Sequence, residues 1–165
     1  MNLQPFFNAT PAIQIHMVAA VGALVLGAIV LWKKKGNRVH KFNGRIWVAL
    51  MMVTALSGFF IHEIKVWGNF SPIHIFSILT SISLLFAIYE ARKGDIDGHQ
   101  RTMKATYIGG MLIAGGFTFL PGRLNHEIFF GDRDWVGLSP AMAFILVFAP
   151  ALLVAAYYWR SRSSS

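Results

Sequence analysis

The sequence has 165 residues, of which 55% are hydrophobic and only 13% are charged, and its mean hydropathy is +0.53. A soluble domain needs a more polar surface, whereas a bilayer selects long apolar runs, because a helix there satisfies its own backbone hydrogen bonds. The absence of cysteine excludes disulfides, thiolate metal sites, iron–sulfur clusters and covalently attached c-type haem. We therefore expect an integral membrane protein whose metal or haem, if any, has other ligands.

Five apolar segments follow one another along the chain, each near the ~20 residues that a helix needs to cross a bilayer of ~30 Å. The loops between them are short, which favours an up-and-down bundle of antiparallel neighbours. The predicted fold is an all-α integral membrane protein with five transmembrane helices, forming a single domain over residues 1–165. The expected helices cover residues 11–32, 39–61, 72–89, 103–120 and 139–159.

The net charge of +8 reflects topology rather than nucleic-acid binding, because the basic residues gather in the loops between apolar segments. Twelve of the fifteen cations fall on one side of the predicted bundle, which the positive-inside rule makes cytoplasmic. The N-terminus is then outside and the C-terminus inside. Cations follow the first segment instead of preceding it, so we expect a retained helix and not a cleaved signal peptide. The twelve are Lys33, Lys34, Lys35, Arg38, Lys41, Arg45, Arg92, Lys93, Arg101, Lys104, Arg160 and Arg162.

All five tryptophans fall near predicted membrane interfaces, where an indole keeps its N–H in contact with water and its ring at the acyl boundary. They are Trp32, Trp47, Trp67, Trp135 and Trp159.

Four histidines mark the entries of four successive helices: His16, His40, His74 and His99. In an up-and-down bundle the first and third helices stand diagonally across the core, as do the second and fourth. This predicts an outer pair, His16 with His74, and an inner pair, His40 with His99. Two opposed imidazoles are the axial ligands of a six-coordinate haem iron. The leading hypothesis is therefore a haem b protein in electron transfer, with two bis-histidine sites.

The residues before the histidines give these side chains fixed positions. Ser71 can cap the third helix and Pro72 suits its first position, so that His74 lies on a rigid first turn. Asp95 and Asp97 can do the same for the fourth helix. Haem propionates or lipid phosphates are the expected partners of nearby cations, namely Arg45, Arg101, Lys104 and Arg123.

Two observations keep simpler interpretations open. Each histidine by itself could be an interfacial side chain that hydrogen-bonds a backbone or a headgroup, and the small residues that follow the histidines also suit plain helix packing. With ~1.5 Å of rise per residue, the inner and outer histidines lie roughly 30 Å apart, a long gap for direct electron transfer. A haem-free accessory or assembly subunit of a larger membrane complex is the alternative from another functional class.

A third hypothesis is an outward-facing metal site. His62 and His126 are each followed by glutamate, and with His16, His74 and two aspartates they could bind zinc or copper(II). The aspartates are Asp132 and Asp134.

No catalytic residue is predicted, and whether the protein is an enzyme stays open. The chain contains no nucleophile motif, phosphate loop or HExxH sequence. No charged residue falls at a helix midplane, which disfavours an ion pump. The expected partners are the lipid bilayer and a larger membrane complex, not nucleic acid.

Four runs, HKFNGRIWVALM, FSPIHIFSILT, HQRTM and FLPGR, occur in this order and spacing between about Ile15 and His126. They resemble the bacterial predicted membrane proteins catalogued as domain of unknown function 2306. The resemblance implies a multi-pass protein of the bacterial inner membrane, with no established activity, and the four paired histidines fall within the similar part.

Overall fold

The structure is a computed structural model that describes residues 3–61, 72–119 and 123–130. The chain divides into two compact units, one formed by Ala9–Leu112 and the other by Met1–Asn8 with Ile113–Ser165. Each unit is described by itself. All regular elements in the described part of the chain are helices.

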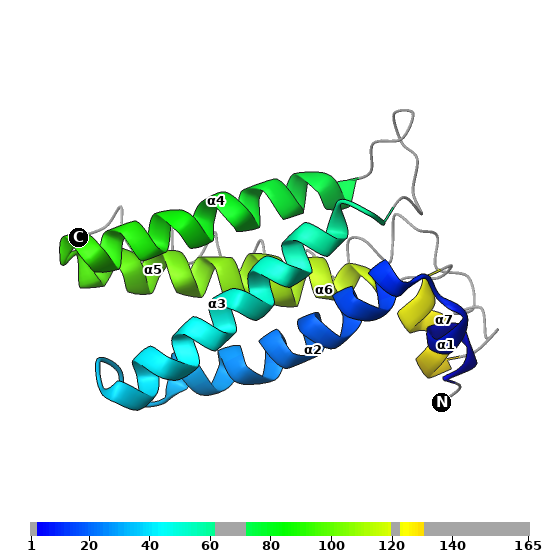
Figure 1. The fold of residues 1–165 in the computed structure, drawn as a ribbon, viewed down its shortest axis with the longest axis horizontal. Helices are drawn as coiled ribbons and strands as arrows, with labels where there is room; N and C mark the ends of the chain where they lie inside the picture. The colour runs from blue at the N-terminus through cyan, green and yellow to red at the C-terminus, as the bar shows by residue number, and fades with distance from the viewer. Residues whose placement is uncertain (1–2, 62–71, 120–122, 131–165) are drawn as a thin grey trace, which may run out of the picture. The chain divides into compact units, whose positions relative to one another are not determined.

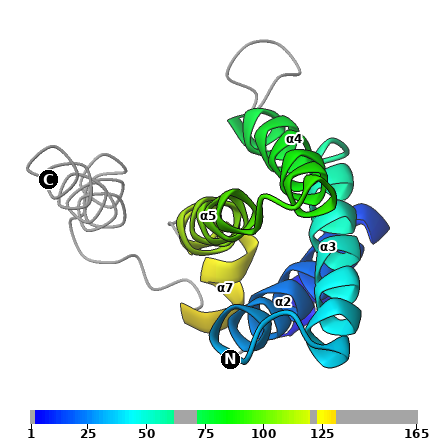
Figure 2. The ribbon, with the colours of Figure 1, turned by 90° about the vertical axis from the view of Figure 1, so that its left-hand side faces the viewer.

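The Ala9–Leu112 unit is a bundle of four helices in which each packs against the next along the chain, and α2 also touches α5 (Figures 1 and 2). Consecutive helices are antiparallel because the connections at Lys33–Asn37 and Gly94–Asp95 are short. A π-helical stretch, Ile108–Ile113, continues directly from α5. The helices are α2 (Pro11–Trp32), α3 (Arg38–Gly58), α4 (Pro72–Lys93) and α5 (Ile96–Tyr107).

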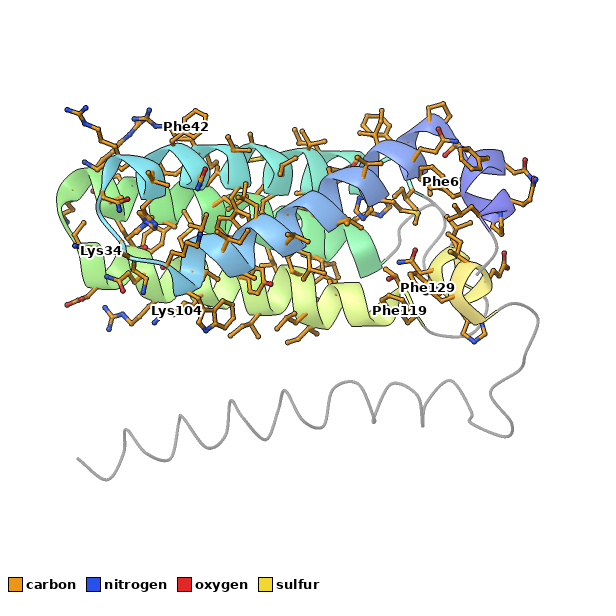
Figure 3. The ribbon with its side chains drawn as sticks, turned by 90° about the horizontal axis from the view of Figure 1, so that it is seen from below. Phe6, Lys34, Phe42, Lys104, Phe119 and Phe129 are labelled. Carbon is orange, nitrogen blue, oxygen red and sulfur yellow. The ribbon has the colours of Figure 1, made fainter. Side chains whose placement is uncertain are left out.

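One end of this bundle, here called the basic end, is where α2 and α4 finish and α3 and α5 begin. Figure 3 labels Lys34 and Lys104 at this end. Both turns there need a glycine at positive φ, Gly36 at 83° and Gly94 at 88°, where a side chain would be strained. The end at which α3 finishes and α4 begins is called the opposite end.

Side-chain caps start the two helices of the basic end. The Asn37 Oδ1 accepts a hydrogen bond of 2.7 Å from the backbone N–H of His40. The Asp95 Oδ1 accepts one of 2.9 Å from the backbone N–H of Gly98. Each cap satisfies a donor that the first helical turn leaves without an intrahelical partner.

The middle of the bundle is apolar and tightly packed. Trp47, Met51 and Leu84 are its largest fully buried side chains. The Trp47 Nε1–H donates to the Ala23 carbonyl over 2.9 Å, and the Tyr107 hydroxyl donates to the Leu24 carbonyl over 3.0 Å. These two bonds tie α3 and α5 to α2. Trp47 therefore differs from the prediction of an interfacial tryptophan, because a backbone carbonyl of α2, and not water, satisfies its indole N–H.

The outer surface of the bundle is also apolar, as a lipid-facing surface must be. In the described ranges, two helical stretches are long and apolar enough to cross a membrane by length and composition, α2 and the His74–Lys93 part of α4. Only 22% of the most apolar window of each is buried, so most of their hydrophobic side chains face outward. Exposed examples are Val18, Val21, Val25, Ile78, Leu79, Ile82 and Leu85.

The helices agree with the predicted segments most closely at the start of the chain. The first segment has the predicted ends, and α4 begins at the predicted Pro72 but continues to Lys93. The fourth predicted segment begins seven residues early, at Ile96, because Asp95 caps the helix before the apolar run starts. The fifth segment, residues 139–159, lies outside the described residues. The prediction of a single domain stays a prediction.

The other unit contributes α1 (Gln4–Asn8), α6 (Ala114–Phe117) and α7 (Leu124–Phe130). Helix α1 packs against α7. The Phe119 and Phe129 rings lie 5.6 Å apart between centroids, and the Asn125 amide donates to the Thr118 hydroxyl.

Candidate functional site

The four predicted ligand histidines lie at the two ends of the Ala9–Leu112 unit, and each belongs to a different helix. At the basic end, the caps that start α3 and α5 place His40 and His99 in the first turn of their helices. At the opposite end, His16 lies in the second turn of α2 and His74 in the first turn of α4. The helix starts therefore determine the level of each imidazole in the bundle.

His99 is held by the neighbouring helix. Its Nδ1 lies 2.8 Å from the Ala87 carbonyl oxygen on α4. A carbonyl oxygen only accepts hydrogen bonds, so Nδ1 carries the proton and, in the neutral ring, Nε2 keeps its lone pair. Metal-binding histidines in proteins are commonly oriented by this kind of bond. The His99 ring is thus held in an orientation that leaves its Nε2 available to bind a metal.

His40 lies at the same end of the bundle as His99. It is in the first turn of α3 and is half-buried. Its Nδ1 is buried and has no hydrogen-bond partner among the described residues. The bundle thus places the two histidines of the predicted inner pair at the same end, each in the first turn of its helix.

His16 is hydrogen-bonded to α3 at the opposite end. Its Nδ1 lies 3.1 Å from the Ser57 Oγ. That hydroxyl has one proton, which it donates to the Val53 carbonyl over 2.6 Å, so it accepts from His16. The Nε2 of a neutral His16 therefore keeps its lone pair, as in His99.

His74 also reaches the end of α3, but with the other ring nitrogen. Its Nε2 lies 3.2 Å from the Phe59 carbonyl oxygen, and its ring stacks on the Phe59 ring at 5.9 Å between centroids. Only 5% of His74 is exposed. His16 and His74 are therefore attached to α3 two residues apart, at Ser57 and Phe59. Binding a metal through Nε2 would require His74 to release the Phe59 carbonyl.

The packed middle separates the two ends. His40 and Ser57 lie 17 residues apart on α3, which corresponds to about 26 Å of helix at 1.5 Å per residue. The Trp47 and Tyr107 rings lie between these levels, 6.3 Å apart between centroids. A Cβ added to Gly27 would come within 2.5 Å of the Trp47 Nε1 and 2.6 Å of the Tyr107 Cε2. The small residues of α2 here accommodate aromatic side chains of the protein itself.

The two ends of the bundle differ in how well their histidines are arranged to bind a haem. At the basic end, His99 is oriented for Nε2 ligation, and the buried Nδ1 of His40 has no hydrogen-bond partner among the described residues, so each ring offers a nitrogen to a ligand. At the opposite end only His16 is so oriented. The expected phosphate or propionate partners Arg45, Arg101 and Lys104 are exposed, whereas Arg123 lies in the other unit.

The outer metal site predicted around His62 and His126 lies mostly outside the described residues. His62, Asp132 and Asp134 are not described. His126 lies on α7, is 4% exposed and belongs to the other unit. Within residues 3–61, 72–119 and 123–130, no three histidines or carboxylates are grouped so that they could hold a metal ion.

Glu90 is a buried carboxylate at the basic end that the sequence analysis did not single out. It is 9% exposed, and its Oε2 has no hydrogen-bond partner in the described part of the chain. A Cβ on Gly98 would lie 2.6 Å from the Glu90 Oε1 and would also meet the Asp95 Oδ2. A side chain at position 98 would therefore displace the carboxylate groups of Glu90 and Asp95. A glutamate directly after an apolar run is the local signal that could have identified this residue.

A model of the family described as "Predicted membrane protein (DUF2306)" matches residues 13–159, which include all four paired histidines. No curated protein and no solved structure matches the chain.

Proposed function

The chain belongs to the DUF2306 family of predicted membrane proteins, and from this premise we propose that it is a multi-pass protein which holds b-type haem on paired histidines and transfers electrons. The proposed membrane is the bacterial inner membrane, where the apolar outer surface of the bundle faces lipid. Haem b is the appropriate form because a chain without cysteine cannot attach haem covalently through thioethers.

The observation that carries the proposal is the His40 and His99 pair at the basic end. These residues begin different helices at the same end of the bundle, and the Ala87 carbonyl orients the His99 ring with Nε2 available. A haem with two histidine ligands supplies one-electron transfer. The role of the protein is to hold the two rings in position and to exclude water with the packed side chains above them.

His16 and His74 are proposed as the axial pair of a second haem at the opposite end. The Ser57 hydroxyl orients His16 for Nε2 ligation. His74 must first exchange its bond to the Phe59 carbonyl for a bond to iron, at a cost of about 1 kcal/mol for the lost hydrogen bond. We therefore expect weaker haem binding at this end than at the basic end.

The proposed topology has five transmembrane helices, with the N-terminus outside and the C-terminus in the cytoplasm. It is supported by the distribution of charge, because three cations lie in the loop between α2 and α3 and seven more lie in the parts of α3, α4 and α5 next to the basic end. The basic end is then cytoplasmic.

The alternative is a haem-free accessory or assembly subunit of a larger membrane complex. One observation favours it: Trp47 and Tyr107 already fill the middle of the bundle against Gly27. The pocket that His40 helps to line has a volume of about 230 Å³, below the ~300–1,000 Å³ typical of cofactor sites. A haem on His40 would therefore need more room than this pocket has.

Absorption spectroscopy of the full chain, purified in detergent from haem-replete cells, tests the proposal. We expect a Soret band, α and β bands on reduction, and up to two haems per chain by pyridine hemochrome assay. His40→Ala and His99→Ala should each remove the same haem, and the double variant should lose little more, because both residues act at one site. His16→Ala and His74→Ala should remove the second haem.

Matched controls are His62→Ala and His126→Ala, which remove an imidazole outside the proposed pairs and should leave the spectrum unchanged. A colourless wild-type protein would contradict the haem proposal and favour the accessory subunit. Loss of haem from His62→Ala, with His16→Ala unaffected, would assign the outer site to a different helix.

A further inference from the structure

A pocket opens at the basic end between the last turn of α2 and the start of α3. Its volume is about 230 Å³. The walls combine an apolar side with polar and cationic groups, and none of its eight lining residues is acidic. They are Ile29, Val30, Lys33, Lys34, Asn37, Val39, His40 and Asn43.

The polar side of the pocket is suited to an anion. Lys33 and Lys34 contribute two ammonium groups, and Asn37 and Asn43 add polar side chains to the lining. Lys35 is close enough for its charge to act on His40. The cations in and beside the pocket therefore attract negative charge to it.

The apolar side of the pocket continues onto a surface that suits an acyl chain. Ile29 lines the pocket and is 38% exposed on α2. Val25 and Trp32 are 57% and 76% exposed, and their spacing from Ile29 puts all three on one face of the helix. Helix α2 is also one of the two candidate membrane spans. The pocket thus lies where a span ends, at the level of lipid headgroups.

We propose that this pocket binds the phosphate of an anionic phospholipid, with an acyl chain lying along Val25, Ile29 and Trp32. Basic pockets between helices at the cytoplasmic face are a recognised form of headgroup site. The volume suits a headgroup and not a whole lipid or a macrocycle. The proposal depends on the membrane character of the family and not on the haem.

Native mass spectrometry of the delipidated full chain tests it. The protein is incubated with equal amounts of phosphatidylglycerol and phosphatidylcholine that carry the same acyl chains. We expect preferential retention of phosphatidylglycerol by the wild type. The variant Lys33→Gln/Lys34→Gln should bind it about thirtyfold more weakly, because two charges near the lipid phosphate are removed. Lys33→Arg/Lys34→Arg should retain the preference.

The matched control is Lys41→Gln/Lys104→Gln, which removes the same charge from exposed positions outside the pocket and should retain the preference. Equal loss in this control would mean that net charge alone attracts the lipid, and would overturn the proposal. The absence of any preference in the wild type would also overturn it. Displacement of the lipid by millimolar inorganic phosphate would show a site for free phosphate and not for a lipid.

Discussion

Gly27 lies where two aromatic side chains from other helices meet α2. The Trp47 and Tyr107 rings approach so closely that no β-carbon fits, and each ring donates a hydrogen bond to a carbonyl of α2. A glycine inside a helix costs about 1 kcal/mol relative to alanine. The close approach compensates for this cost with buried aromatic surface and two satisfied donors.

Gly27→Ala should therefore destabilise the bundle, although alanine is the better helix former. The added carbon must displace two rings that are packed and hydrogen-bonded, and we expect a loss of about 1–3 kcal/mol. Thermal unfolding in detergent, followed by circular dichroism, measures it. The matched control is Gly44→Ala on α3, where a β-carbon would meet nothing within 4 Å and should raise stability by about 0.5–1 kcal/mol. A stabilised Gly27→Ala variant would contradict the packing described for this position.

Among the helices, α3 is the one whose first turn most needs a side-chain cap. Three cations, Arg38, Lys41 and Arg45, lie in its first turns, where the positive end of the helix dipole disfavours them. The Asn37 cap offsets this by accepting the His40 N–H. The cap therefore stabilises the turn that carries His40.

Asn37→Ala should fray the first turn of α3. Loss of an N-cap costs about 1 kcal/mol, and we expect faster amide hydrogen exchange at residues 39–41 with little change near Met51. Hydrogen–deuterium exchange with mass spectrometry detects this difference. Asn43→Ala, inside the same helix, serves as the control and should leave the exchange of the first turn unchanged. Equal exchange in the two variants would indicate that the Asn37 side chain does not hold the turn.

At the scale of the whole molecule, charge and hydropathy divide the chain into membrane-facing surfaces and a polar, basic end. Most of the large apolar side chains of α2 and α4 are exposed, whereas several of their buried residues are small, such as Ala19, Ala23 and Ala87. The membrane and not water must therefore cover these helices. The orientation proposed above follows from the cations of the basic end.

Reporter fusions test this orientation. Fusions after Lys35 and after Arg101 should be active as cytoplasmic reporters, because positively charged loops stay inside. Fusions near Asn69 and Asp132 should behave as periplasmic. An even number of spans would place both termini on one side, and would remove the alternation of helix entries from which the histidine pairs were predicted.

Much of the fold could be predicted from the sequence because the signals are local. Apolar length located α2, and Pro72 marked the start of α4. Helix caps and clusters of charge can likewise be recognised from a few consecutive residues. The predicted apolar segment began too late at residue 103, because hydropathy does not detect the polar first turn of α5, whereas the predicted Asp95 cap is confirmed.

The sequence by itself determined the class of protein, the level of each histidine along its helix and the basic character of one end. Only the tertiary structure decided what each histidine contacts. The partners of His16, His74 and His99 lie 41, 15 and 12 residues away, at Ser57, Phe59 and Ala87. Two of these partners are backbone carbonyls, which every residue has, so no residue pattern identifies them. The relative rotation of packed helices selects which carbonyl meets which ring nitrogen, and that rotation depends on side chains such as Trp47 and Tyr107 fitting against Gly27.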